Sequence, residues 1–159
     1  MTVKLTQFIT LVLVALVAGV FWGPWLGLSR SIDAFTPETF LAIGQTMIEN
    51  LAPVMPVLML LAAASQLALL VLLYRQRSTG FPAVAIGFAL FLAALLVTLL
   101  VEVPIDNQIK AWTLDSMPAN WMDLRDKWER FHVLRTFSAL VGMAMVIAAT
   151  VFGRPRSPS

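Results

Sequence analysis

Charged side chains are missing from four long stretches of the chain. No Asp, Glu, Lys or Arg occurs between Leu5 and Ser29, Leu51 and Tyr74, Thr79 and Val101, or Thr136 and Gly153. A helix needs about 20 apolar residues to cross the hydrocarbon core of a bilayer, and each stretch is long enough. The pattern predicts membrane-spanning helices near residues 5–28, 54–74, 81–103 and 133–153.

These stretches have the pattern of helices and not that of barrel strands. Barrel strands alternate apolar and polar residues over about ten positions, whereas residues 67–73 and 88–97 are apolar at nearly every position. The first stretch is too long for the apolar core of a signal peptide, so we expect it to be a retained helix. We therefore expect an all-α fold, an integral membrane four-helix transmembrane bundle that forms a single domain over residues 1–159.

Two long connections, 29–53 and 104–132, lie on one side of the predicted membrane. In the first, Thr36-Pro37-Glu38 has the pattern of an N-cap, a proline at the first helical position and an early acidic residue. We expect a short interfacial helix from there to about Asn50, between the first and second spans. It could serve as a lid over the bundle or as a plain amphipathic connector.

The distribution of charge predicts the orientation. Lys4, the turn 75–80 and the tail Arg154-Pro155-Arg156 are basic and carry no acidic residue, whereas all nine acidic residues lie in or beside the two long connections. Because positively charged loops tend to remain in the cytoplasm, we expect both termini there and both long connections outside it. The expected location is the inner or cell membrane of a bacterium.

Composition excludes several classes of protein. Apolar residues make up 59% and charged residues 13% of the chain, about half the charge of a soluble domain, which excludes a water-soluble globule. The absence of cysteine excludes disulfides, thiolate metal sites and cysteine nucleophiles. The net charge is only +2 and the basic residues are scattered, so the expected partner is the lipid bilayer and not a nucleic acid.

Small residues recur every four positions in two of the predicted spans. They are Ala15, Gly19, Gly23 and Gly27 in the first and Ala85, Ala89 and Ala93 in the third. Such rows let helices approach closely. We expect them to pack within the bundle, and contact between copies in a homo-oligomer is the alternative.

Most residues capable of acid, base or hydrogen-bond chemistry lie between Glu102 and Thr136. If the second part of this region is helical, one face carries Trp121, Arg125, Trp128, His132 and Arg135, at spacings of four, three, four and three residues. This face includes the only histidine of the chain.

Glu102 and Arg135 lie at neighbouring ends of the third and fourth spans, where an unpaired charge would be costly. We expect them to pair. Charged groups at membrane depth usually face the interior of a bundle and are candidates for function. The alternative is an interfacial ion pair that only joins the two helix ends.

His132 is the candidate for proton transfer, because an unperturbed imidazole has a pKa of about 6.5. The alternative is a hydrogen-bonded interfacial histidine. With Glu102 and Asp106 it makes an incomplete ligand set for iron, copper or zinc, so we expect no metal. Asp106 and Asn107 could cap a turn or orient a substrate. Gln66, inside the second span, could line a cavity or bond a neighbouring helix.

Two motifs of this region resemble those of the anthrone oxygenase-like family. Residues 103–107, Val-Pro-Ile-Asp-Asn, are similar to the family's Val-Pro-apolar-Asn-Asn pattern, with Asp106 where the family usually has asparagine. Trp128, His132, Arg135 and Thr136 are similar to its Trp-x3-His-x2-Arg-Thr pattern. Together with the helix arrangement, the resemblance covers most of the chain.

The resemblance implies oxidation of an anthrone, a reduced tricyclic aromatic, to the anthraquinone with molecular oxygen. The corresponding hypothesis is a membrane-embedded oxygenase without a cofactor, acting on a lipophilic aromatic, anthrone- or quinol-like substrate. His132 would be the base, Arg135 and Asn107 would stabilise the anion, and Glu102 would orient His132 or Arg135. Further substrate contacts would come from Trp128, Trp112, Asp106 and Gln66.

A second hypothesis is a non-enzymatic membrane protein, such as an accessory subunit or a small-molecule binder. The polar cluster would then only fasten the helix ends together. Substitutions of His132 or Asn107 would impair folding without a catalytic effect. The sequence leaves both hypotheses open.

Overall fold

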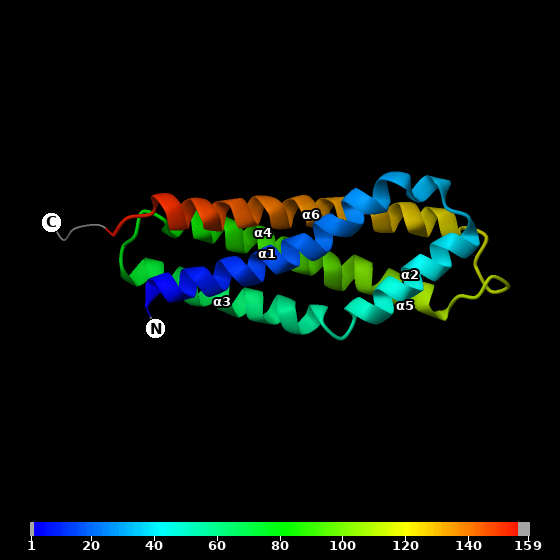
Figure 1. Cartoon of the computed structure of the whole chain (residues 1–159), viewed down its shortest axis with the longest axis horizontal. Helices are drawn as coiled ribbons and strands as arrows, with labels where there is room; N and C mark the ends of the chain where they lie inside the picture. Colours follow the sequence, from blue (N-terminus) through cyan, green and yellow to red (C-terminus); the bar gives the residue numbers. More distant parts are fainter. Residues whose placement is uncertain (1, 156–159) are drawn as a thin grey trace.

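The structure, a computed structural model, describes residues 2–155 and is an elongated bundle of helices (Figure 1). Every secondary-structure element in this range is helical. In chain order they are α1 (Val3–Gly27), the 3₁₀ segment η1 (Ser29–Ala34), α2 (Pro37–Leu51), α3 (Met55–Arg75), α4 (Phe81–Val97), the π-helical segment η2 (Thr98–Glu102), α5 (Val103–Ala111) and α6 (Trp121–Phe152).

Four helical runs are long and apolar enough to cross a membrane. They are Val3–Ala34, Met55–Arg75, Phe81–Ala111 and Trp121–Phe152. Their outer surfaces carry large apolar side chains, among them Phe8, Leu60 and Leu100, which are 65%, 66% and 71% exposed. Such a surface is stable against lipid and unfavourable in water. The predicted all-α membrane bundle is confirmed.

The two described ends of the chain lie at the same end of the bundle as the turn between α3 and α4 (Figure 1). Hydrogen bonds fasten the C-terminal end of α6 to this turn. The Thr79 backbone N–H donates to the Arg154 carbonyl at 3.0 Å, and the Arg154 N–H donates to Thr79 Oγ1 at 2.9 Å. Because both ends of the described chain lie at the same end of the bundle, the chain crosses the membrane an even number of times, as the sequence indicates.

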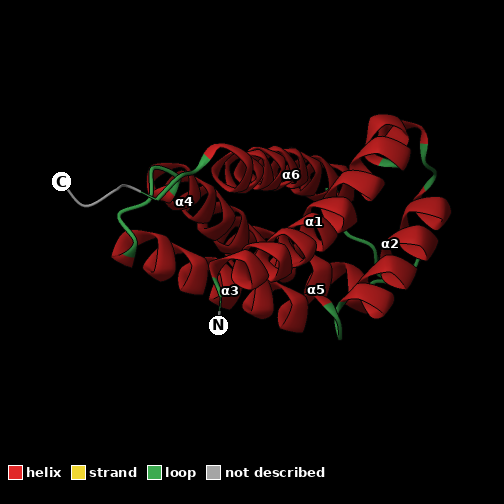
Figure 2. Ribbon diagram, turned by 60° about the vertical axis from the view of Figure 1, so that its left-hand side comes forward, coloured by secondary structure: helices red, strands yellow, loops and turns green. Residues whose placement is uncertain are grey.

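The predicted interfacial helix is α2. Its N-cap is Thr36, whose Oγ1 accepts from the Thr39 N–H at 3.3 Å. The helix ends at Leu51, before Pro53. It lies at the end of the bundle away from the termini, beside α5 (Figures 1 and 2). Gln45 joins the two helices, because its Nε2 donates to the carbonyls of Ile109 and Trp112 at 3.0 and 2.9 Å.

The third membrane helix continues beyond the residue where the sequence predicts its end. Proline lacks the N–H that would bond four residues back, and Pro104 follows a π-helical segment in which the Val103 N–H donates to the Thr98 carbonyl. This wider turn takes up one additional residue, so the chain remains helical to Ala111. The first part of the predicted connection 104–132 is therefore helical.

The fourth membrane helix begins earlier than the predicted residue 133. It starts at Trp121 and runs without a break to Phe152. No glycine or proline occurs from Trp121 to Phe131, so nothing in that segment disfavours helix. The polar face of this segment is thereby continuous with the membrane-spanning part of α6.

Helices α4 and α6 approach each other closely at Gly87 and Gly142. A Cβ atom on Gly87 would lie 2.8 Å from the Gly142 carbonyl oxygen, and one on Gly142 would lie 3.0 Å from the Gly87 carbonyl oxygen. The predicted packing of the first small-residue row within the bundle is wrong. Cβ atoms on Gly19, Gly23 and Gly27 would meet nothing within 4 Å, because this row faces outward.

Candidate functional site

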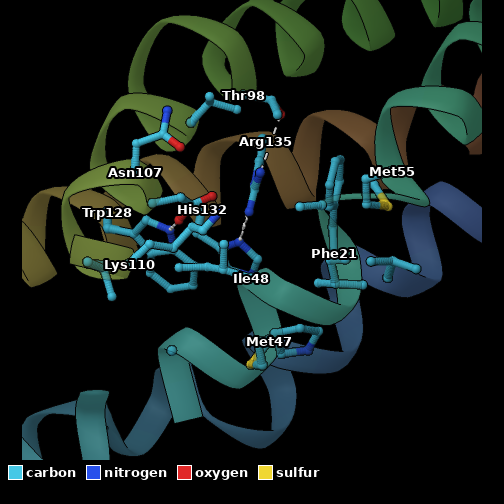
Figure 3. Close-up of a pocket in the computed structure, with 18 of the residues that line it drawn as sticks. Phe21, Met47, Ile48, Met55, Thr98, Asn107, Lys110, Trp128, His132 and Arg135 are labelled. Atoms are coloured by element: carbon cyan, nitrogen blue, oxygen red, sulfur yellow. Dashed lines mark hydrogen bonds between the residues drawn. The ribbon is translucent and has the colours of Figure 1, made fainter. Parts of the chain in front are cut away.

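A cavity of about 470 Å³ lies in the half of the bundle away from the termini. Apolar side chains from several elements form most of its surface. Phe21 comes from α1, Met47 and Ile48 from α2, and Met55 and Met59 from α3 (Figure 3). Methionines adapt their shape to a ligand, so this surface suits a bulky apolar molecule.

The opposite side of the cavity, here called the polar wall, comes from η2, α5 and α6. Its residues are Thr98, Asp106, Asn107, Lys110, Trp128, His132 and Arg135 (Figure 3). Asp106 and Lys110 are four residues apart and share a face of α5, while Trp128, His132 and Arg135 share a face of α6. Helices α5 and α6 thus present their polar faces to the same space.

Arg135 is the centre of the polar wall. Its Nη2 lies 2.9 Å from Glu102 Oε2, and its Nη1 donates to Thr98 Oγ1 at 3.3 Å. The guanidinium carbon lies 4.6 Å from the centre of the Phe21 ring. The expected Glu102–Arg135 pair is present, and Glu102 is fully buried behind the arginine. A charge buried at this depth is stable only while its partner is in place.

His132 is held between Arg135 and Trp128. Its Nδ1 accepts hydrogen bonds from Arg135 Nε at 3.2 Å and Nη2 at 2.9 Å. Its ring stacks on the Trp128 ring, with centroids 4.7 Å apart and planes 6° apart. Trp128 Nε1 in turn donates to Asp106 Oδ1 at 3.1 Å. The contacts form one chain of interactions from Asp106 to Glu102.

Four residues of the polar wall have positions that the sequence analysis leaves open or does not predict. Asp106 and Asn107 lie inside α5, so of the two interpretations that the sequence leaves open, the turn cap does not apply. Lys110 lines the cavity but is not among the predicted site residues. Its position follows from the four-residue spacing to Asp106 once the helix continues through Pro104. Thr98 likewise reaches the site through η2.

Two predicted substrate contacts lie outside the cavity lining. Gln66 is fully buried in α3, and its side-chain N and O atoms have no hydrogen-bond partner within residues 2–155. Trp112 packs against an apolar cluster that includes Ile105 and Ile109, and its carbonyl accepts from Gln45. Neither side chain lines the cavity.

The outer part of the polar face of α6 has a different role from the inner part. Arg125 Nη2 lies 2.9 Å from Asp33 Oδ1 and 2.7 Å from Asp126 Oδ1. The Arg125 guanidinium also lies over the Trp121 ring, 5.5 Å from its centre. Arg125 therefore joins α6 to η1, and neither Trp121 nor Arg125 lines the cavity.

The described part of the chain offers no cluster of metal ligands. No group of three or more His, Cys, Asp or Glu side chains within residues 2–155 could hold a metal ion. Two candidate ligands at the site, Glu102 and His132, are both engaged by the Arg135 guanidinium.

The fold and the site define a class of small membrane proteins with an apolar cavity and a buried cationic and imidazole cluster. The model of the anthrone oxygenase family matches residues 45–145, more than half of the chain and all seven residues of the polar wall. The chain belongs to the anthrone oxygenase family, which supports an oxygenase-like role in general. No curated protein and no solved structure matches the chain.

Proposed function

We propose that the protein oxidises a lipophilic aromatic substrate, anthrone- or quinol-like, with molecular oxygen and without a cofactor. The observation that carries this proposal is the cavity, an apolar space with one wall that contains Arg135, whose side chain is only 11% exposed, and the only histidine of the chain. Pockets with mostly apolar surfaces and a few convergent polar groups are typical of small-molecule sites. The cavity lining includes Leu60 and Leu99, which are 66% and 54% exposed on the apolar outer surface, so a substrate dissolved in the membrane can reach the cavity.

The size of the cavity supports a substrate of several fused rings. A cavity of about 150 Å³ accommodates one benzene molecule, and the cavity here has about 470 Å³. The space is thus roughly three times that needed for a single ring. A planar tricyclic molecule is a good match for this volume.

The proposed reaction needs no added reductant. A base removes one proton from a CH₂ group between two aromatic rings, and the electron pair becomes delocalised onto the ring ketone oxygen. The anion gives an electron to O₂, the two radicals combine to a peroxide, and loss of water leaves a carbonyl. One substrate and one O₂ give one quinone and one water, because the CH₂ group supplies all four electrons.

The polar wall contains the groups that this chemistry requires. Arg135, Lys110 and Asn107 are donors that can hold a developing oxyanion in a site of low polarity. His132 and Asp106 are the groups that could accept the proton. The apolar surface opposite them provides space for O₂.

A non-enzymatic binder is the second candidate, and one observation favours it. The groups of the Glu102–Arg135–His132 cluster mainly contact one another, as they would in a purely structural cluster. The cavity would then hold a lipophilic ligand without changing it.

Oxygen consumption separates the two candidates. Purified protein in lipid nanodiscs would be incubated with anthrone, and O₂ uptake would be followed together with anthraquinone absorbance. We expect uptake and quinone formation in a ratio of one to one, well above the rate with empty nanodiscs and unchanged after dialysis against a chelator. Binding of anthrone without protein-dependent oxidation would overturn the oxygenase and support the binder.

We also propose that both termini are cytoplasmic. Lys4, Arg75, Arg77 and Arg154 are at that end of the bundle, in accordance with the positive-inside tendency. Fusing a reporter that fluoresces only in the cytoplasm to the C-terminus tests this. Fluorescence is expected, and activity of a periplasm-dependent reporter at the same position would reverse the orientation.

A further inference from the structure

We infer that His132 acts as a neutral hydrogen-bond donor to a substrate oxygen, through Nε2–H, and not as the base of the reaction. This inference rests on the proposed function and assigns a chemical role to one residue of its site. It reverses the role that the sequence indicates for the histidine. The argument starts from the partners of its two ring nitrogens.

Arg135 determines which ring nitrogen carries the proton. Arginine has five N–H donors, no acceptor, and is not deprotonated in proteins. Its Nε and Nη2 both point at His132 Nδ1, at 3.2 and 2.9 Å. Nδ1 must therefore offer its lone pair, and a neutral ring with a lone pair on Nδ1 has its proton on Nε2. A doubly protonated ring would direct an N–H at the guanidinium.

Neither partner is free to turn away. The Arg135 guanidinium is fixed by Glu102 at 2.9 Å and by Thr98 at 3.3 Å, and it lies against the Phe21 ring. The histidine ring is stacked on Trp128 with only 6° between the planes. Because contacts on several sides hold both side chains, the fold itself favours the His132 tautomer with its proton on Nε2.

The Nε2 side of the ring is ready for an acceptor. His132 lines the cavity and is 1% exposed, and its Nε2 has no hydrogen-bond partner within residues 2–155. The Phe21 carbonyl, which accepts from Thr136 Oγ1 at 3.4 Å, also approaches the histidine, so a bound substrate oxygen would replace it as the acceptor of Nε2–H. An unpaired buried donor is costly, and a substrate oxygen that becomes negative in the reaction would satisfy it.

The proton of the substrate then needs another acceptor. Asp106 is the one carboxylate among the described residues that line the cavity, and its Oδ1 is positioned by Trp128 Nε1 at 3.1 Å. The proton moves from the substrate carbon to Asp106, and the electron pair moves to the oxygen facing His132.

Nitrogen-15 NMR of the wild-type protein tests the protonation state directly. The chain has one histidine, so labelling histidine alone gives a single pair of ring signals, provided that the purification tag is free of histidine. We expect an unprotonated Nδ1 and a protonated Nε2. A proton on Nδ1, or on both nitrogens, would overturn the inference whether or not the protein oxidises anthrone.

Binding of anthraquinone tests whether Nε2–H faces the ligand. This product-like molecule has carbonyl acceptors and is not oxidised further, and quenching of tryptophan fluorescence would report its binding. We expect the Nε2–H signal to shift at saturation while the Nδ1 signal changes little. An unchanged Nε2–H signal with the site occupied would mean that the Phe21 carbonyl, and not the ligand, holds the proton.

Two substitutions separate a donor from a base. Glutamine can accept from Arg135 through Oε1 and donate through Nε2 but cannot act as a base, so His132→Gln is expected to retain O₂ uptake within about tenfold of wild type. His132→Ala removes the donor and should lose about 100-fold or more. Equal loss in both variants, with wild-type folding of His132→Gln, would overturn the donor role. A wild-type protein that shows the expected NMR signals and no oxidation would instead count against the proposed function.

Discussion

The two halves of the bundle are packed in opposite ways by the same long helices. Near the termini, α4 and α6 touch backbone to backbone at Gly87 and Gly142, and Leu69, Val84 and Val146 fill the space beside them. In the other half, helices α1, α3 and α6 and the outer elements η1, α2, η2 and α5 surround a cavity of about 470 Å³. The first half is dense and apolar, whereas the second is hollow and carries the buried charges.

This difference indicates that the dense half positions the helices and the hollow half provides the space for a ligand. Dense packing has no room for a ligand and resists deformation, so the half with Gly87 and Gly142 fixes the rotation of α6 about its axis. Arg135 lies two helical turns from Gly142 on the same helix. The close contact therefore determines where the polar residues of α6 face the cavity. Four substitutions test this comparison.

Glu102→Ala should have the largest effect, in the hollow half. It leaves Arg135 buried without its carboxylate, and removal of one partner from a buried pair costs about 3–5 kcal/mol. The free energy of unfolding in detergent measures the loss. Glu102→Gln is the matched control, because it keeps the shape and an acceptor for Arg135. Equal stability of Glu102→Ala and wild type would show that the pair contributes little.

Asp106→Asn should leave the fold intact and lower the rate of O₂ uptake by about 100-fold. The amide oxygen can still accept from Trp128 Nε1, so the substitution removes the basic group and little else. Circular dichroism and anthraquinone binding serve as controls for folding. Wild-type activity in this variant would remove Asp106 from the mechanism and indicate that the substrate is bound already ionised.

Gly87→Ala tests the dense half. The new methyl would lie 2.8 Å from the Gly142 carbonyl oxygen, and overpacking of this kind costs about 1–3 kcal/mol. Gly19→Ala is the matched control, since its methyl meets nothing within 4 Å and alanine favours helix by up to about 1 kcal/mol. Melting temperatures in the same detergent should move in opposite directions. If both substitutions changed the melting temperature in the same direction, the contact between Gly87 and Gly142 would not be what fixes the packing of α4 on α6.

Gln45→Ala should have the smallest and most local effect. The carbonyls of Ile109 and Trp112 lose their bonds to Nε2, a loss of about 1–2 kcal/mol in the docking of α2 on α5. Hydrogen exchange should become faster in α2 while α4 and α6 are unchanged. Thr46→Ala is the control, because Thr46 bonds only within α2, to the Ala42 carbonyl. Unchanged exchange in α2 would show that apolar contacts alone hold it.

The sequence predicted the membrane helices well, because the absence of charge over about 20 residues has a direct physical meaning in a bilayer. It also predicted the start of α2 from Thr36 and Pro37, and the shared face of Trp128, His132 and Arg135. These are local patterns, in which neighbours along the chain decide the structure. The Glu102–Arg135 pair could be predicted because an unpaired charge is unfavourable in each helix.

Features that depend on contacts between helices could not be predicted. Glycine rows look alike whether they face a neighbour or lipid, so the sequence could not show that Gly19 faces outward and that Gly87 carries the close contact. The role of Lys110 depends on a helix that continues through Pro104. Arg135 contacts His132 Nδ1 within α6, but Glu102 and Thr98 of η2 hold the guanidinium there, and this part of the arrangement exists only in the folded bundle.

The wider π-helical turn of η2 determines the direction in which the side chains of α5 point around the helix axis. Successive helical residues are about 100° apart around the axis. Deleting one residue, such as Leu100, would therefore rotate α5 by roughly a quarter of a revolution relative to α4. Asp106, Asn107 and Lys110 would swing away from the histidine together, and Pro104 would meet a carbonyl in front of it. A single inserted position thus decides whether two helices share one chemical site or present separate polar surfaces.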